Sequence, residues 1–372
     1  MKNIALLSYN HNKYSETFIQ DLVKHLPYKV HYLYGGELPM YNGSGNSFMD
    51  TSPKGKLKKA YKEWLGTPEP QQHKKAVEQY LLKHNIEAVY ANYAITAFPV
   101  MEICNRLNIP LIVHFWGWTA YRSTLLEKYK KEYAELFQIA KAVICVSTDM
   151  QKQLISLGCP ASKVHYVSSW ANTELFTYSD HSSNPPIFFT AGRFCDTKNP
   201  HLTVLAFSKA LPDIPNAKLV MAGGDENLMN ACVNLCKALG IADKVAMLGA
   251  VPQQQIFALT QQAYAFVQHS ATTILNEKEG TPYAILEACA AGLPVIATRH
   301  AGVCDVVIEN ETGLLCNEYD VDAMAADMVK LWNDKEMAKR IGMAASKHVR
   351  EHYNMEQQLT AITAIVDNVR LK

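Results

Sequence analysis

Several features are absent from this 372-residue chain, and each absence narrows its function. No stretch approaches the ~20 apolar residues that a membrane-spanning helix needs. Lysine and arginine total 36 against 35 aspartates and glutamates, so the net charge of +1 gives no general attraction to nucleic acid. Low-complexity tracts are missing too. The opening MKNIALLSYN has an apolar run too short for a signal peptide, and we expect it to form a buried strand.

Cysteine occurs in an odd number, nine, without the spacing of a metal site. Cys232 and Cys236 lie one helical turn apart, but no second pair of ligands lies near them in the sequence. We therefore expect buried, reduced thiols in a cytoplasmic protein. The composition, 48% hydrophobic and 19% charged, is that of a globular chain long enough for two domains.

Short apolar runs alternate with helical patterns in two successive series. The first series of expected strands reads NIALLSY, KVHYLYG, EAVYANY, LIVHFWG and AVICVST. The second reads IFFTAG, AKLVMAGG, KVAMLG, AYAFVQ, LPVIAT and TGLLC. Strands that alternate with helices indicate parallel sheets covered on both faces. We therefore predict an α/β protein with two Rossmann-like, doubly wound domains that face a central cleft.

The predicted domains are residues 1–178 and 179–354, followed by a last helix over 355–372. The join lies in the polar stretch 178–186, which ends in two prolines. Thr17, with Gln20 three residues later, predicts a capping box for the first helix.

The basic segment 54–75 is less regular, and two interpretations stay open. Its lysines form either the solvated face of a surface helix or a peripheral contact with anionic lipid headgroups or a charged acceptor.

The segment EKEGTPYAILEACAAGLPVIAT combines two glutamates with a helix start at the end of a strand. Glu279 and Glu287 have seven residues between them. Thr281 suits the helix N-cap, Pro282 suits the first helical position, and the helix continues over 283–291. Such an N-terminus at the carboxyl edge of a sheet favours an anion such as phosphate. The alternative is a solvated loop charge at Glu279 and a surface helix residue at Glu287.

A second group of residues follows the strand IFFTAG. The strand ends at Gly192, Arg193 and Lys198 lie in the loop, and Asn199-Pro200 begins a helix. Two cations beside a second helix start can neutralise a diphosphate, although solvated loop cations are the alternative. Together with the two glutamates, they fit an elongated ligand such as a nucleotide sugar.

These motifs resemble the retaining glycosyltransferases of family 4, which have the glycosyltransferase-B fold. The resemblance covers most of the chain and is carried by SETFIQDLVKHL, GRFCDTKN, LVMAGGDE, VAMLGAVP, the two-glutamate segment, and AGVCDVV followed by TGLL. It implies transfer of a sugar, with retention of its anomeric configuration, from a UDP- or GDP-sugar to a glycan or glycolipid hydroxyl. The SETFI opening is similar to that of members that build bacterial surface polysaccharides.

The resemblance also implies roles for individual residues. Arg193 and Lys198 would hold the donor diphosphate, Glu279 the transferred sugar and Glu287 the ribose. His114, after the strand LIVHF, would contact the donor sugar from across the cleft, although a core histidine is the alternative. With protein cations at the diphosphate, no metal or other cofactor is expected. The remaining donor-site candidates are Gly192, Gly280, Thr281, Pro282, Tyr283 and Val251, the last in the loop GAVPQQQ that would read the base.

Acceptor candidates come from the first domain, where the chain departs from the family pattern. The Gly-Gly pair common after the first strand is replaced by the loop SYNHNKYSETF, so Asn10, His11 and Ser15 are candidates there. Trp116, Trp118 and Tyr121 either stack on an acceptor sugar or pack in the core. Thr281-Pro282 replaces the Phe-Gly of many members but keeps a helix start.

Three other functions stay open at this point. One is a different enzyme on the same fold, such as a nucleotide-sugar epimerase or a phosphorylase. Another is a non-enzymatic carbohydrate- or nucleotide-binding protein. The third is a hydrolase that uses Glu279 and Glu287 as a carboxylate pair across the bond it cleaves. The combination of Arg193, Lys198 and the two glutamates favours the transferase.

Overall fold

The computed structural model describes residues 1–11, 16–49, 55, 61, 69–224 and 226–370. The chain forms two compact units. Unit 1 comprises Met1–Val146, Met150–Val167 and Leu359–Lys372, and unit 2 comprises Ser147–Asp149 and Ser168–Gln358. The main passage between them lies between Val167 and Ser168, before the polar stretch 178–186.

Among the described residues, unit 1 contains a seven-stranded sheet in the order β3-β2-β1-β4-β5-β6-β7. All neighbouring strands are parallel except β2 and β3, which are antiparallel. β4 reads AVYAN and is buried along its whole length, as expected for a central parallel strand. The strands are β1 (Asn3–Ser8), β2 (Lys29–Tyr34), β3 (Tyr41–Asn42), β4 (Ala88–Asn92), β5 (Leu111–Phe115), β6 (Ala142–Cys145) and β7 (Val164–Tyr166).

Amphipathic helices connect the strands of unit 1. In α1, for example, Phe18, Ile19 and Leu22 share the buried face. The helices are α1 (Thr17–His25), α3 (Glu69–Lys83), α4 (Ala94–Leu107), α5 (Trp118–Tyr121), α6 (Ser123–Lys128), α7 (Lys130–Ile139), α8 (Thr148–Ser156) and the 3₁₀ turn η1 (Ala161–Lys163).

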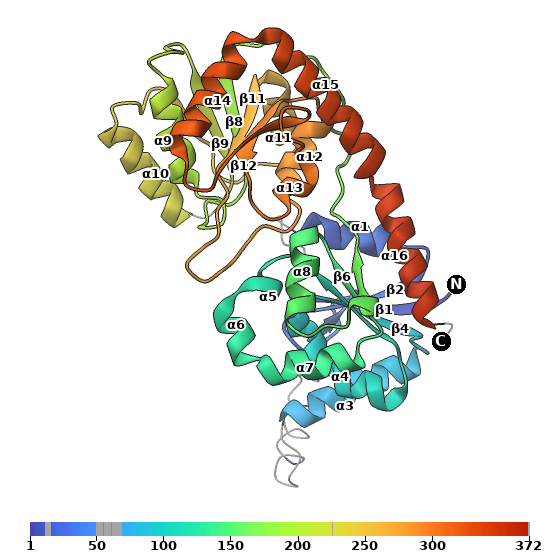
Figure 1. The fold of residues 1–372 in the computed structure, drawn as a ribbon. Coiled ribbons are helices and arrows are strands. Elements are labelled where there is room, and N and C mark those ends of the chain that lie inside the picture. The colour runs from blue at the N-terminus through green and yellow to red at the C-terminus, as the bar shows by residue number, and fades with distance from the viewer. Residues whose placement is uncertain (12–15, 50–54, 56–60, 62–68, 225, 371–372) are drawn as a thin grey trace. The chain divides into compact units, whose positions relative to one another are not determined.

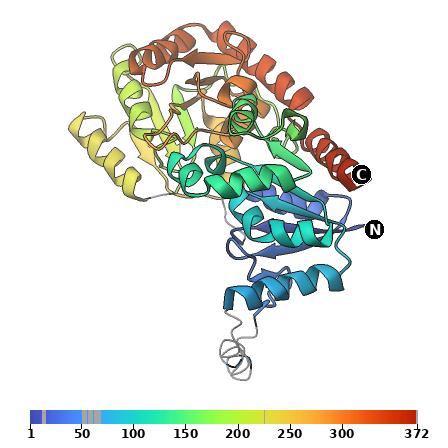
Figure 2. The ribbon, with the colours of Figure 1, turned by 60° about the horizontal axis from the view of Figure 1, so that its bottom comes forward.

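The last helix, α16 (Met355–Arg370), starts in unit 2 and returns to unit 1. Ile362 and Val366 on this helix are buried. The Tyr28 hydroxyl donates to the Thr363 carbonyl at 3.2 Å, and Lys2 Nζ lies 3.2 Å from Asp367 Oδ1. The start of the chain and the end of α16 therefore lie side by side (Figures 1 and 2).

Unit 2 contains, in its described part, a six-stranded parallel sheet in the order β10-β9-β8-β11-β12-β13. The chain builds outward from β8 to β10 and then returns to the other side of β8 with β11. The carboxyl ends of β8 and β11 therefore flank a topological switch point, where ligands of such sheets bind. The strands are β8 (Ile187–Ala191), β9 (Lys218–Ala222), β10 (Val245–Met247), β11 (Ala265–Gln268), β12 (Val295–Thr298) and β13 (Gly313–Cys316).

Helices cover the faces of this sheet (Figure 1). Adjacent residues of β8 serve opposite faces, because Phe188 belongs to one hydrophobic cluster and Phe189 to another. The helices are α9 (Pro200–Ala210), α10 (Glu226–Ala238), α11 (Gln253–Gln262), α12 (Tyr283–Ala290), α13 (Val303–Val306), α14 (Val321–Asn333) and α15 (Lys335–His352).

Two expected helix caps are wrong. Thr17 is the first residue of α1, and Glu16 takes the N-cap position without a side-chain cap bond. Likewise, Pro282 rather than Thr281 is the N-cap residue of α12. Thr281 is buried, and the Pro282 carbonyl accepts from Ile285 N at 3.1 Å, so helical bonding begins one residue later than expected. Ser15 and most of the basic segment 54–75 lie outside the described residues.

Candidate functional site: a pocket in unit 2

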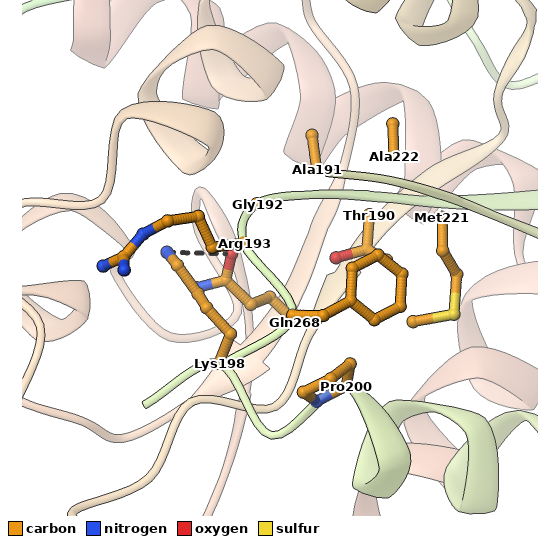
Figure 3. A pocket seen from close by; sticks show the side chains of 10 residues that line it. Thr190, Ala191, Gly192, Arg193, Lys198, Pro200, Met221, Ala222 and Gln268 are labelled. Atoms are coloured by element: carbon orange, nitrogen blue, oxygen red, sulfur yellow. Dashed lines mark hydrogen bonds between the residues drawn. The ribbon is translucent and has the colours of Figure 1, made fainter. Parts of the chain in front are cut away.

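A pocket lies at the switch point of the unit 2 sheet (Figure 3). Its walls come from the end of β8 and the loop after it, from β9, from the start of α9, and from the last residue of β11. The lining residues are Thr190, Ala191, Gly192, Arg193, Phe194, Lys198, Pro200, Met221, Ala222 and Gln268.

A glycine sets the course of the loop that forms one wall. A Cβ at Gly223 would lie 1.7 Å from the Gly192 carbonyl oxygen, so any side chain there would displace the loop after β8. Backbone bonds hold the two segments together, from Gly192 N to Ala222 O at 2.8 Å and from Phe194 N to Gly224 O at 2.8 Å. This close approach brings Arg193 to the rim of the pocket.

The two predicted cations differ in their surroundings. Arg193 is exposed. Lys198 Nζ donates to Gln268 Oε1 at 3.4 Å and lies 3.1 Å from Glu279 Oε1. The side chains of Lys198 and Glu279 are only 18% and 12% exposed, so water screens this pair less than a surface pair. The structure thus brings Lys198 and Glu279, which are distant in sequence, into direct contact.

The segment before α12 is packed tightly against the start of α13. A Cβ at Gly302 would lie 1.8 Å from the Gly280 carbonyl oxygen, so the close approach of these backbones requires glycine. Gly280, Thr281 and Pro282 are buried, and Tyr283 is half-buried. Behind them, Ile285 and Leu286 are fully buried, which anchors α12 on the sheet. The helix N-terminus and Glu279 are therefore held at the carboxyl edge of the sheet.

Glu287 lies farther along α12, where it accepts a 2.8 Å hydrogen bond at Oε1 from Gln253 Nε2. Burial raises the pKa of the Glu287 carboxyl to about 7, and the Gln253 bond opposes this shift. Gln253 is the first residue of α11 and belongs to the GAVPQQQ segment, so the sequence had indicated the segment but not the residue. Val251, also from that segment, is half-buried against the core under α12.

Two residues that the sequence analysis did not single out complete this edge. His300 follows β12, and Glu318 follows β13. The His300 ring is fully buried; its Nε2 lies 3.0 Å from Glu279 N, and its Nδ1 lies 2.5 Å from Glu318 Oε1. Motif reasoning missed both, because neither has a partner nearby in the sequence.

In unit 1, His114 lies at the carboxyl end of β5 and is fully buried. Its Nδ1 is 2.5 Å from the Tyr90 hydroxyl, and the Trp116 ring stacks on it with 3.8 Å between ring centroids. Burial lowers the pKa of His114 well below its usual value, so the ring is neutral. Within the part of the chain that the structure describes, His114 Nε2 has no hydrogen-bond partner. Contact with a donor sugar stays a prediction.

The acceptor candidates of unit 1 do not form one cluster of exposed aromatic rings. Tyr121 is fully buried and packs in the core, whereas Trp118 is half-buried. Trp116 donates through Nε1 to Asn92 Oδ1 at 2.9 Å. In the loop after β1, Asn10 donates to Glu16 Oε1 at 2.9 Å, and His11 stacks on Tyr34 with a centroid distance of 3.9 Å.

One carboxylate pair in unit 2 has the spacing of metal ligands but has structural partners. Asp320 and Asp322 form an Asp-x-Asp sequence. Asp320 Oδ1 accepts from Ala323 N at 2.9 Å and so caps α14, and Asp322 Oδ1 lies 2.6 Å from Lys209 Nζ. In the described ranges, no helix combines the length and apolar character needed to cross a bilayer.

Two Rossmann-like units, with cations and carboxylates gathered at the switch point of the second sheet, define the class of enzymes with the glycosyltransferase-B fold. Each half of the chain also matches a known protein family. Residues 172–348 match the family model for glycosyl transferases group 1, and residues 15–175 match the model for glycosyltransferase family 4. The chain belongs to glycosyltransferase family 4.

Relatives with curated names agree with this assignment. The chain is 27% identical over 259 residues to the amylovoran biosynthesis glycosyltransferase AmsK of Erwinia amylovora, covering 68% of this chain and 63% of AmsK. It is 25% identical over 247 residues to the putative colanic acid biosynthesis glycosyltransferase WcaL of Salmonella typhimurium, covering 65% and 60%. The chain thus matches somewhat over half of the length of each relative.

Solved structures share the fold over nearly the whole chain. A sucrose-phosphate synthase from Thermosynechococcus elongatus superposes with a TM-score of 0.77 at 18% identity, covering 99% of each chain. Anabaena HepE in complex with UDP-glucose superposes with a TM-score of 0.77 at 16% identity, covering 99% of this chain and 100% of HepE. At these identities the likeness concerns the fold.

Proposed function

We propose that this protein is a retaining glycosyltransferase that moves a sugar from a nucleoside diphosphate sugar to a hydroxyl of a glycan or glycolipid. The proposed pathway is the synthesis of a bacterial surface polysaccharide, which the naming of AmsK and WcaL supports. The observation that carries the proposal is the contact of Lys198 with both Glu279 and Gln268, beside Arg193, at the switch point of the unit 2 sheet.

The donor would bind along this edge with a different group at each part of the molecule. Arg193 and Lys198 would neutralise the diphosphate together with the N-terminus of α12. Glu287 would accept hydrogen bonds from the ribose hydroxyls, and Glu279 would bind the sugar. UDP and GDP are the proposed nucleotides, and the complex of HepE with UDP-glucose supports the first.

In the proposed reaction, the bond between the anomeric carbon and the departing phosphate oxygen breaks. The acceptor oxygen then bonds to that carbon from the same face, and the departing phosphate takes the acceptor proton. Positioning and electrostatic stabilisation of the departing diphosphate by Arg193 and Lys198 supply the catalysis, so no metal is required.

Unit 1 would bind the acceptor, and the loop with Asn10 and His11 is a candidate surface for it. His114 would contact the donor sugar with a hydrogen bond through Nε2. The proposed location is the cytoplasm, which the nine free cysteines support, with residues 54–75 as the candidate peripheral membrane contact.

The test is a calorimetric titration of the full chain with UDP, GDP and ADP and their sugars, with and without magnesium. We expect one nucleotide to bind without metal, and Arg193→Ala and Glu287→Ala to weaken this binding by about 10-fold or more. Lys209→Ala is the matched control, because it removes a cation from an ion pair elsewhere in unit 2. The proposal is wrong if none of the nucleotides binds, or if both site variants bind as tightly as the control.

A further inference from the structure

The buried ring of His300 joins two glutamates whose roles differ. On one side Nε2 faces the backbone amide of Glu279 at 3.0 Å, and on the other Nδ1 faces the carboxylate of Glu318 at 2.5 Å. The ring itself has no exposed surface. His300 therefore links the loop before α12 to the end of β13.

The partners determine which ring nitrogen carries the proton. A backbone N–H only donates, so Nε2 must accept from Glu279 and carries no hydrogen. The proton then lies on Nδ1 and is donated to the Glu318 carboxylate. A carboxylate that fixes the tautomer and orientation of a histidine in this way is a common supporting arrangement in binding sites.

Glu318 is itself held in place. Its Oε2 accepts from Thr272 N at 2.8 Å, and its Oε1 lies 3.3 Å from Thr272 Oγ1. Burial alone would raise the pKa of Glu318, but the hydrogen bonds from His300 and Thr272 hold it below its usual value. Thr272, His300 and Glu318 follow β11, β12 and β13, which are neighbours in the sheet. The orientation of His300 therefore depends on three adjacent strand ends.

We infer that His300, oriented by Glu318, is a positioning residue that holds the Glu279 carboxylate in place for the sugar of the donor. This inference rests on the proposed function. The amide that His300 binds and the carboxylate that pairs with Lys198 belong to the same residue, Glu279. Loss of the amide bond frees the backbone on the sugar side. The proposed diphosphate ligand Lys198 keeps its contact with Gln268, and no hydrogen bond joins His300 to Arg193 or Glu287 among the described residues.

We therefore expect the loss of His300 to weaken the binding of the nucleotide sugar but not the binding of the nucleotide alone. In His300→Ala, the Kd for UDP-glucose rises on the order of 10-fold, the size expected for one lost buried hydrogen bond, and the Kd for UDP stays within about 2-fold. The same holds for GDP-mannose and GDP if guanine is the base. His300→Gln restores most of the affinity, because its side-chain oxygen can replace Nε2 as the acceptor.

The experiment is a calorimetric comparison of UDP with UDP-glucose, and of GDP with GDP-mannose, for the wild type and each variant. Glu318→Gln leaves one acceptor oxygen where two now accept, from His300 and from Thr272 N, so it weakens the orientation of His300 and provides a second route if His300→Ala does not fold. His181→Ala is the control for the loss of a buried histidine in unit 2, since the hydrogen bonds of His181 among the described residues are to the Ala263 and Ala291 carbonyls and the Asn184 amide. Glu279→Ala completes a double-mutant cycle with His300→Ala.

Support for the inference is a sugar-selective loss in His300→Ala and Glu318→Gln that disappears in the Glu279→Ala background. If the wild type binds these ligands but the ratio of the two Kd values is the same in every variant, the positioning role is wrong while the proposed function stands. If the wild type binds none of the four ligands and none of the ADP series, the proposed function fails and this inference with it.

Discussion

Raising the pH from 6 to 8 should strengthen the binding of a nucleotide sugar by about 10-fold through Glu287. The carboxyl of Glu287 has a pKa raised to about 7 by burial. With that pKa, roughly one tenth of the molecules carry the charged form at pH 6 and roughly nine tenths at pH 8. The proposed ribose hydroxyls donate to the charged carboxylate, so binding selects the deprotonated protein, and its apparent affinity follows that fraction.

Rising pH has the opposite effect on the stability of the folded protein. Between its usual value of 4.5 and about 7, the folded Glu287 holds a proton that the unfolded chain has lost. The contribution of this group to stability therefore falls as the pH rises through that window. The ligand-free protein loses stability from Glu287 in the same range in which its affinity for the donor grows.

Isothermal titration of UDP-glucose, or of GDP-mannose if guanine is the base, at pH 6, 7 and 8 tests the reasoning. A nucleotide sugar is the suitable ligand because its diphosphate has no free terminal phosphate that titrates near neutrality. Glu287→Gln removes the titrating group while keeping the size of the side chain, and its affinity should be independent of pH over this range. An unchanged affinity in the wild type, or an equal pH dependence in Glu287→Gln, would refute the assignment of Glu287 to the ribose.

Two further perturbations test the architecture of the pocket. Lys198→Ala should weaken the binding of UDP or GDP on the order of 10- to 100-fold and reduce the dependence of the Kd on salt, because a partly buried cation is lost. Titration at two salt concentrations measures both effects. An unchanged salt dependence would count against a contact between Lys198 and phosphate. Gly302→Ala should destabilise the fold by about 1–3 kcal/mol and weaken donor binding, because its Cβ would lie 1.8 Å from the Gly280 carbonyl oxygen. Denaturant unfolding measures the loss of stability. An unfolding midpoint equal to that of the wild type would show that the backbone at Gly280 and Gly302 can separate without a loss of stability.

The strands of both sheets could be predicted because a buried parallel strand is a local signal. Runs such as IFFTA and LPVIAT are apolar except for one threonine each, and all eleven expected strands are present. The short strands β3 and β7 were missed, because Tyr41–Asn42 and Val164–Tyr166 have only two and three residues and no long apolar run. The caps expected at Thr17 and Thr281 were wrong, because tertiary packing decides where the first helical bond forms.

The site was predictable to the extent that its residues follow strand ends within recognisable motifs. Arg193, Lys198, Glu279 and Glu287 could be named in advance. The first three lie in loops after expected strands, and Glu287 lies in the second turn of the expected helix that follows Glu279. The pairing of Lys198 with Glu279 was not predictable, since it depends on β8 lying next to β11 in the sheet. The burial of Tyr121 and His114 likewise depends on the packing of unit 1.

The amino-acid sequence by itself determined the α/β class, the two series of strands and the charged residues after β8 and before α12, because these features depend on neighbours along the chain. Only the tertiary structure decided which strand ends are adjacent. That order brings Lys198 to Glu279, Gln253 to Glu287, and Glu318 through His300 to the backbone of Glu279. The physical reason is that each of these contacts joins residues that are far apart in the sequence. Such residues come close in space only when the parallel sheet has formed.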